Sequence, residues 1–184
     1  CRESPNREEP VAHSSVRPAA DAPRHGAAAD VSPPNVCLLS NGRYTVMLTQ
    51  AGSGYSTCDG LDVTRWREDA TSDCWGQYFY IRDLDGGRAW SAGRQPLGGD
   101  ADEYEAMLGL DGAVFQRRDG DIETRYEIAV AADADAEVRR ITLTNHGVLP
   151  RMLDVTSYAE VSLNSRRADQ AHPAFAKLFL ETEY

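Results

Sequence analysis

The sequence contains no long apolar run. No stretch approaches the roughly 20 consecutive apolar residues that a membrane-spanning helix needs. The first residues, Cys1-Arg2-Glu3-Ser4-Pro5, also lack the apolar core of a signal peptide. We therefore expect a soluble, cytoplasmic domain without direct membrane insertion.

Cysteine and histidine are scarce and scattered. The four cysteines form no C-x-x-C pair and no dense spacing (Cys1, Cys37, Cys58 and Cys74), so the sequence indicates neither a zinc ribbon nor a disulfide framework. A bridge between Cys58 and Cys74 stays open, because it depends on whether the strands beside them pair. The four histidines have no metal-ligand spacing, so we expect neither a metal nor a cofactor.

Clustered positive charge is also missing. The chain has 29 acidic and 19 basic residues, which gives a formal net charge of -10. The basic residues alternate with carboxylates, as in Arg65-Trp66-Arg67-Glu68-Asp69, whereas nucleic-acid binding needs Lys and Arg gathered on one face. We therefore expect no nucleic acid among the partners.

What the first 35 residues do contain is proline and alanine. Six of the nine prolines lie in this part of the chain, and no hydrophobic periodicity accompanies them. Such a composition buries too little apolar surface to offset the entropy of ordering the chain. Residues 1–35 are therefore predicted to be a disordered or extended linker, and residues 36–184 a single β-sandwich domain.

From residue 36 onward, apolar and polar residues alternate in short runs. In residues 121–130 one face is expected to hold Ile122, Thr124, Tyr126, Ile128 and Val130, and the other face is charged. This period of two is typical of a strand with one buried and one solvent-exposed face. In residues 151–161 the same alternation puts Leu153 and Val155 on one face and Tyr158 on the other.

The pattern predicts about nine strands and almost no helix. The strands are expected at residues 44–48, 76–83, 88–91, 103–110, 113–118, 121–130, 138–144, 151–161 and 175–182. Turns such as Asp85-Gly86-Gly87 and Asp119-Gly120 separate them and suit tight hairpins. Strands spaced by about 8 to 12 residues favour a sandwich over a barrel. A final strand at 175–182 would leave an open sheet edge, so we expect the sandwich to be incomplete at its C-terminal end.

Residues 64–69 combine the side chains that carbohydrate sites use. An indole face stacks on a sugar ring, and Arg and Asp side chains make directional hydrogen bonds to sugar hydroxyls. The alternative is structural: Trp66 covers the core, and Arg67 pairs with Asp69 or another neighbour. The sequence leaves both interpretations open.

No residue is expected to be catalytic. Gly52-Ser53-Gly54 lacks the third glycine and the following helix of a dinucleotide-binding loop, so it is predicted to be a turn between strands. Ser157 lacks the Gly-x-Ser-x-Gly motif of a hydrolase nucleophile. Glu68, Asp69 and Asp73 could serve a glycosidase only at a separation that a sequence does not give, and solvated loop charges are the favoured interpretation.

Six short segments carry a family resemblance through their order along the chain. They are Leu39-Ser40-Asn41-Gly42-Arg43-Tyr44, Gly52-Ser53-Gly54-Tyr55-Ser56, Thr64-Arg65-Trp66-Arg67-Glu68-Asp69, Trp90-Ser91-Ala92-Gly93, Ser157-Tyr158-Ala159-Glu160-Val161 and His172-Pro173-Ala174-Phe175. Together they resemble the amino-terminal β-sandwich of glycoside hydrolase family 94, in the version found in cyclic β-1,2-glucan synthases. The resemblance covers residues 38–184 and leaves the predicted linker outside it.

The resemblance implies an all-β fold, an antiparallel two-sheet supersandwich similar to the galactose mutarotase fold. In the family this domain precedes a helical linker and an (α/α)6 barrel, which holds the catalytic carboxylic acid and the phosphate site. The implied reaction is inverting phosphorolysis or transfer on β-linked glucosides. Because these residues do not include the barrel, the chain alone is expected to be non-catalytic.

The resemblance also implies partners and a site. The expected partners are a β-glucan oligosaccharide, the (α/α)6 catalytic domain of a parent protein and a second copy in a homodimer. The parent is expected to be anchored in the bacterial inner membrane. The residues that match the motif and are expected to form a sugar-facing or interdomain loop are Tyr55, Arg65, Trp66, Arg67, Glu68 and Asp69. A free-standing carbohydrate-binding module is the alternative function.

Overall fold

The computed structural model describes residues 35–69 and 72–183. The linker predicted for residues 1–35 lies outside this part of the chain except for Asn35, so it stays a prediction. Every described residue belongs to one compact unit.

Antiparallel strands dominate that unit, as predicted. A five-stranded sheet has the order β1 (Val36–Ser40), β2 (Tyr44–Thr49), β3 (Gly54–Cys58), β4 (Leu61–Thr64) and β12 (Val161–Asn164). A four-stranded sheet has the order β10 (Glu137–Asn145), β9 (Ile122–Val130), β8 (Ala113–Asp119) and β7 (Glu103–Leu108). A three-stranded sheet has the order β11 (Leu153–Ala159), β5 (Gln77–Asp83) and β6 (Ala89–Ser91). The all-β, antiparallel fold class is therefore confirmed.

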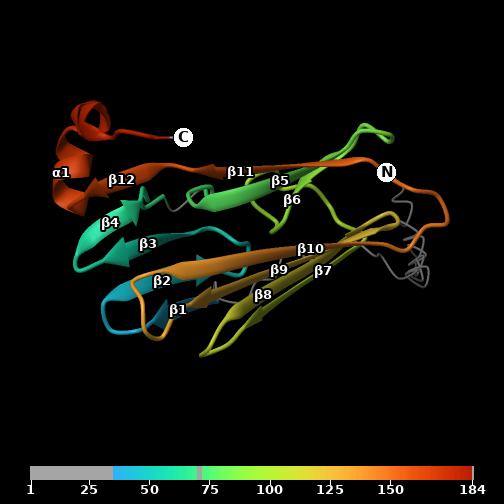
Figure 1. The fold of residues 1–184 in the computed structure, drawn as a ribbon, viewed down its shortest axis with the longest axis horizontal. Helices are drawn as coiled ribbons and strands as arrows, with labels where there is room; N and C mark the ends of the chain where they lie inside the picture. The colour runs from blue at the N-terminus through green and yellow to red at the C-terminus, as the bar shows by residue number, and fades with distance from the viewer. Residues whose placement is uncertain (1–34, 70–71, 184) are drawn as a thin grey trace, which may run out of the picture. The chain divides into compact units, whose positions relative to one another are not determined.

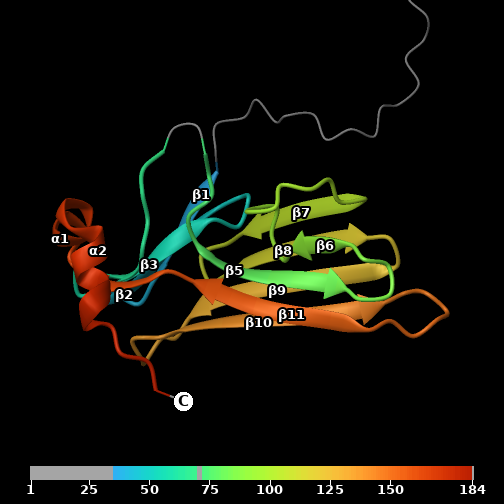
Figure 2. The same cartoon turned by 90° about the horizontal axis from the view of Figure 1, so that it is seen from above.

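The sheets form two layers. Figure 1 shows the three-stranded sheet above the four-stranded sheet, with the five-stranded sheet at one end of both. There β1 and β2 lie level with the lower layer, β4 and β12 lie level with the upper one, and β3 lies between them. In Figure 2 the strands β5 and β11 lie over β9 and β10. The architecture is thus a sandwich in which one sheet crosses between the layers.

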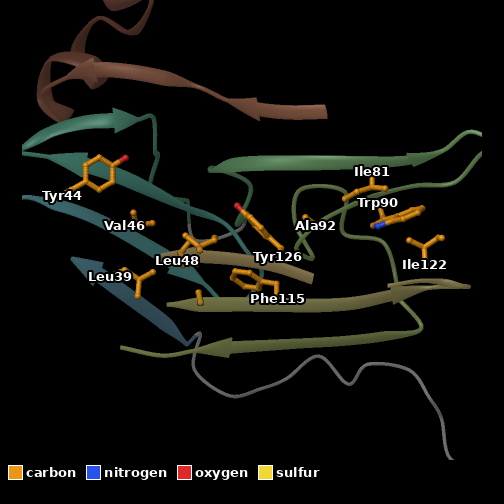
Figure 3. Close-up of a cluster of buried hydrophobic side chains, with 12 residues drawn as sticks. Leu39, Tyr44, Val46, Leu48, Ile81, Trp90, Ala92, Phe115, Ile122 and Tyr126 are labelled. Carbon is orange, nitrogen blue, oxygen red and sulfur yellow. The ribbon is translucent and has the colours of Figure 1, made fainter. Parts of the chain in front are cut away.

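The core lies between these layers and draws on all three sheets. Figure 3 shows the buried side chains, which include Val46 and Leu48 from β2, Ile81 from β5, Phe115 from β8 and Tyr126 from β9. The buried indole of Trp90 on β6 donates a hydrogen bond to Thr124 Oγ1 on β9 at 3.0 Å, which satisfies its polar atom. The shared core joins the three sheets into one unit.

Strand β9 has the faces that the alternation predicts. Ile122, Thr124, Tyr126 and Ile128 are buried, whereas the charged residues between them are half-buried on the outer face. The hairpin partner β8 shows the same alternation of buried and half-buried residues. A period of two is therefore sufficient to orient this hairpin in the sandwich.

The predicted strand at residues 175–182 is wrong. This part of the chain is helical, with α1 (Arg166–Ala171), α2 (Pro173–Ala176) and the 3-10 turn η1 (Lys177–Phe179). The short apolar run Leu178-Phe179-Leu180 fits a helix as well as a strand, and Pro173 is pre-organised for a first helical turn. Within the described ranges, none of the helices is long and apolar enough to cross a membrane.

The predicted strand at residues 151–161 is two strands in two sheets. β11 pairs with β5, and β12 pairs with β4. The break falls at Glu160, whose backbone carbonyl accepts a hydrogen bond from Arg65 N at 2.7 Å. The chain thereby passes from the three-stranded sheet to the five-stranded sheet next to the segment that the sequence marked as a candidate site.

Candidate functional site

The candidate loop begins where β4 ends. Residues 65–76, here named the 65–76 connection, join β4 to β5. Helix α1 packs against β12, the neighbour of β4 in the sheet, at the same end of the domain (Figure 1). The predicted site residues therefore meet residues of α1 that lie about a hundred positions later in the chain.

Tyr55 and Trp66 form an aromatic pair that holds a cation. Their ring centroids are 5.6 Å apart at an interplanar angle of 55°. The guanidinium carbon of Arg166 on α1 lies 4.5 Å from the Tyr55 centroid and 5.7 Å from the Trp66 centroid. Asp62 accepts two hydrogen bonds from Arg166, both of 3.1 Å, and they raise the pKa of this guanidinium. Arg166 therefore occupies part of both π faces, while both rings remain partly exposed.

Arg65 is buried and anchors the connection. Its side chain is 4% exposed, and its Nη2 donates to Asp169 Oδ1 on α1 at 2.7 Å. A second donor, Nη1, reaches Glu160 Oε2 at 2.6 Å. Hydrogen bonds from Arg65 hold the pKa of the Asp169 carboxyl below its usual value. Arg65 thus positions the connection and does not face solvent.

Residues 67–69 run outward from this anchor. Arg67 Nη2 lies 2.6 Å from Asp169 Oδ2, so two guanidinium groups share one buried carboxylate. Arg67 Nη1 is buried and has no hydrogen-bond partner among the described residues. Glu68 and Asp69 are exposed. The structure therefore brings Tyr55, Arg65, Trp66 and Arg67 together around α1 and places Glu68 and Asp69 at exposed positions outside this group.

The far end of the 65–76 connection is tied to the β2–β3 turn. Thr49 Oγ1 donates to Asp73 Oδ2 at 2.7 Å, and Ser53 Oγ donates to the Asp73 carbonyl at 2.6 Å. Gly54 N donates to the Trp75 carbonyl at 2.8 Å. Gly54 is required there, because a Cβ would collide with the carbonyl oxygen of Met47. The connection is thus fixed at both ends, and residues 50–53 form the turn that was predicted around Gly52-Ser53-Gly54.

Sequence reasoning missed four partners of the site. They are Asp62, Glu160, Arg166 and Asp169. The signal for α1 was present: Ser165 is the N-cap, its hydroxyl accepts from Ala168 N, and Asp169 lies in the first turn. No hydrophobic period marks so short a helix, so Arg166 and Asp169 fell outside every predicted element.

No group of three or more His, Cys, Asp or Glu side chains in the described ranges could hold a metal ion. His146 Nε2 lies 3.0 Å from Glu123 Oε2 on the surface.

Cys37, Cys58 and Cys74 are free thiols, so the Cys58–Cys74 bridge left open by the sequence is not formed. Burial raises the pKa of the Cys37 thiol, which leaves it protonated and unreactive at neutral pH.

A groove of about 640 Å³ lies away from the candidate loop. It is lined by residues of β1, by Gln50, and by Ala106, Leu108, Gly109 and Leu110 at the end of β7. None of the predicted site residues lines it.

Comparisons with known proteins assign the chain to a family. A family model described as glycosyl hydrolase 94, supersandwich domain, matches residues 23–184. The cyclic beta-(1,2)-glucan synthase NdvB of Rhizobium meliloti (strain 1021) is 43% identical over 146 residues, which cover 79% of this chain and 5% of that protein. The N,N'-diacetylchitobiose phosphorylase of Vibrio proteolyticus is 28% identical over 160 residues, covering 84% of this chain and 20% of the relative.

The 3-O-beta-D-glucopyranosyl-beta-D-glucuronide phosphorylase of Paenibacillus borealis is 30% identical over 117 residues, which cover 64% of this chain and 14% of the relative. The chain thus spans a fifth or less of the length of these three proteins. The matched region includes every strand and helix that the structure describes. The chain therefore belongs to the glycosyl hydrolase 94 family, and residues 23–184 match its supersandwich domain.

Proposed function

We propose that this chain is the non-catalytic supersandwich domain of a longer enzyme that processes β-linked glucans. The observation that carries the proposal is the 43% identity, over 79% of the chain, to a cyclic β-1,2-glucan synthase. In this proposal the bond-making and bond-breaking groups belong to an (α/α)6 catalytic barrel elsewhere in the longer protein. The supersandwich supports that barrel and contributes to the surroundings of its sugar site.

The 65–76 connection is the proposed contact with the sugar or with the catalytic domain. Tyr55 and Trp66 are only partly buried, and Glu68 lies at an exposed position from which its carboxylate can accept hydrogen bonds from sugar hydroxyls, with Asp69 beside it. Arg65 and Arg67 act through position, because both bind Asp169. The two anchored ends support this role, since a binding loop needs a fixed frame.

Other features of the longer protein follow by analogy and are part of the proposal. A β-glucan oligosaccharide is the ligand, and the catalytic barrel is the partner within the chain. The parent forms a homodimer and is anchored in the bacterial inner membrane, with this domain in the cytoplasm.

Two assays test the proposed function. The 184-residue chain should form no sugar phosphate from linear β-1,2-glucan oligosaccharides and phosphate, whereas the longer protein should form it. In the longer protein, Trp66→Ala should lower kcat/KM about tenfold through loss of a stacking face. The matched control is Phe179→Ala, which removes an exposed ring outside the connection and should leave kcat/KM unchanged.

Turnover by the 184-residue chain alone would refute the non-catalytic role. Equal kcat/KM for Trp66→Ala and the longer wild-type protein would refute the role of the connection. The coding sequence beyond Tyr184 supplies an independent check, because a barrel is expected there. Without one, the chain would be a free-standing carbohydrate-binding module.

A further inference from the structure

A row of tyrosines lies on the outer face of the upper layer. In the β5–β11 pair, Tyr158 is opposite Tyr78 and Thr156 is opposite Tyr80, so Tyr78, Tyr80 and Tyr158 project from one face. The alternate residues of β5 face the core: Ile81 is fully buried, and the ring of Phe79 lies 5.6 Å from that of Tyr126. The tyrosine face is therefore the outer one.

One of the three tyrosines is structural, and two are accessible. Tyr78 is 4% exposed, and its hydroxyl shares a 3.0 Å hydrogen bond with Ser53 Oγ beside the 65–76 connection. Tyr80 is half-buried, and Tyr158 on the edge strand β11 is 47% exposed. The Tyr158 hydroxyl donates to Glu160 Oε1 at 3.2 Å, which steadies the ring from one side.

Polar groups surround the two accessible rings. Arg82 on β5 and Asp154 and Thr156 on β11 all project from the same face, and all three are exposed. They offer a guanidinium, a carboxylate and a hydroxyl within one or two positions of the rings. This combination of flat apolar faces and hydrogen-bonding groups matches a pyranose ring, which has C–H faces and a rim of hydroxyls.

The outer face of the other layer provides an internal comparison. On β8, β9 and β10 the outward positions, all of them described, carry no aromatic residue. They carry polar contacts instead, such as the ion pairs of Arg125 and Arg140 with Glu127. An exposed strand face in this protein therefore needs no aromatic ring, and the tyrosines of β5 and β11 need a separate explanation.

We propose that the outer face of β5 and β11 is a carbohydrate-binding platform for a short β-linked glucan. Tyr158 and Tyr80 stack on neighbouring sugar residues, and Arg82, Asp154 and Thr156 bind their hydroxyls. The ligand class rests on the proposed function, but the residues are separate from the 65–76 connection. A protein partner fits less well, because specific protein interfaces bury about 800 Å² per partner around an apolar core, and only two aromatic rings among charged groups are available here.

The test uses the 184-residue chain and linear β-1,2-glucan oligosaccharides in titration calorimetry and in amide chemical-shift mapping. Wild type should bind in the millimolar range or better, with shifts confined to β5 and β11. Tyr158→Ala should weaken binding roughly five- to tenfold, and Tyr158→Phe should keep it within about twofold, because stacking needs the ring and not the hydroxyl. Phe179→Ala, which removes another exposed ring, is the matched control and should bind like wild type.

Three outcomes would overturn the platform. They are no binding by the folded wild-type chain, shifts that map to the 65–76 connection, and equal affinities of Tyr158→Ala and wild type. Shift mapping on the wild-type chain keeps the test decisive if a variant does not fold. None of these outcomes affects the assays of turnover and of Trp66→Ala in the longer protein, so the platform and the proposed function can fail separately.

Discussion

Asp169 is the residue that fixes the 65–76 connection to the rest of the domain. Its side chain is 1% exposed and forms ion pairs with Arg65 and Arg67. Glu160 supplies a second negative charge to Arg65, so the two guanidinium groups are balanced by two carboxylates. A buried ion cluster gives little net stability over apolar packing, but removal of one member leaves an uncompensated charge.

We predict that Asp169→Asn lowers the free energy of unfolding by about 3 kcal/mol at neutral pH. Denaturant unfolding followed by tryptophan fluorescence measures the change. Asp100→Asn, at an exposed position in the β6–β7 connection, is the control and should stay within about 0.5 kcal/mol of wild type. Arg65→Met combined with Asp169→Leu should cost less than the sum of the single changes. Additive costs would show that the pair is not coupled.

The pH dependence of the same variant gives a second readout. Hydrogen bonds from Arg65 lower the pKa of Asp169 in the folded state. A carboxyl with a lowered folded pKa stabilises above its unfolded pKa, near 4, and this contribution is lost as pH falls through the folded pKa. The difference between wild type and Asp169→Asn should therefore be constant from about pH 7 to 5 and shrink below about pH 4. A difference that persists unchanged in acid would contradict the ion-pair account.

At the scale of elements, the sequence misses β1, β3 and β4 and predicts the strands in which the alternation of apolar and polar residues is clear. β9 is the clearest case, because its buried positions hold Ile122, Tyr126 and Ile128. β4 was missed because its pattern is inverted: Leu61 is 50% exposed, whereas Asp62 is 4% exposed. Asp62 points inward to bind Arg166, a residue that hydrophobic periodicity cannot connect to β4.

A turn signal existed for β4 even so. Asp59 and Gly60 both have positive φ angles, 47° and 81°, as a two-residue hairpin between β3 and β4 requires. The Asp-Gly pair marks such a hairpin in a sequence. For the candidate site, too, the sequence shows only the local part. The motif around Trp66 can be read from the sequence, but the α1 residues that bind it lie far away in the chain. Long-range ion pairs leave no local pattern.

The 65–76 connection should loosen when its far anchor is removed. We predict that Thr49→Val, which loses the 2.7 Å hydrogen bond to Asp73, speeds amide exchange in residues 72–76 about tenfold. The free energy of global unfolding should fall by no more than about 2 kcal/mol, because the change removes two partly exposed hydrogen bonds, the one to Asp73 and the 3.3 Å bond that Thr49 Oγ1 accepts from Ala51 N. Hydrogen-exchange mass spectrometry measures the first quantity.

Thr142→Val, at an exposed position on the outer face of β10, is the control for that experiment. It makes the same change of a hydroxyl to a methyl group and should leave exchange in residues 72–76 unaltered. Equal exchange in the Thr49→Val and wild-type proteins would mean that the bond to Asp73 does not hold the connection.

At the scale of the whole domain, one polar network ties the three sheets together inside the sandwich. Glu137 on β10 accepts from Ser56 Oγ on β3 at 2.6 Å and from Tyr44 OH on β2 at 3.2 Å. Arg139 Nε donates to Glu137 at 2.9 Å, and Arg139 Nη1 donates to Tyr126 OH on β9 at 2.6 Å. A further bond from Arg139 reaches a backbone carbonyl of β5. Burial, with the neighbouring Glu137 charge, raises the pKa of Tyr44 to about 12, so its hydroxyl stays a donor.

Glu137 should therefore matter more to stability than any other carboxylate at the β10 edge. Its side chain is 10% exposed and that of Arg139 is 6% exposed, so Glu137→Ala leaves a buried guanidinium and two hydroxyl groups without their acceptor. We predict a loss of about 3 to 5 kcal/mol in the free energy of unfolding, and a smaller loss for Glu137→Gln, which keeps an acceptor oxygen. Glu105→Ala on the exposed face of β7 is the control and should cost no more than about 0.5 kcal/mol. Thermal and denaturant unfolding of wild type and the three variants measure these changes. Equal stabilities of Glu137→Ala and Glu105→Ala would mean that the sheets are held together by the apolar core alone.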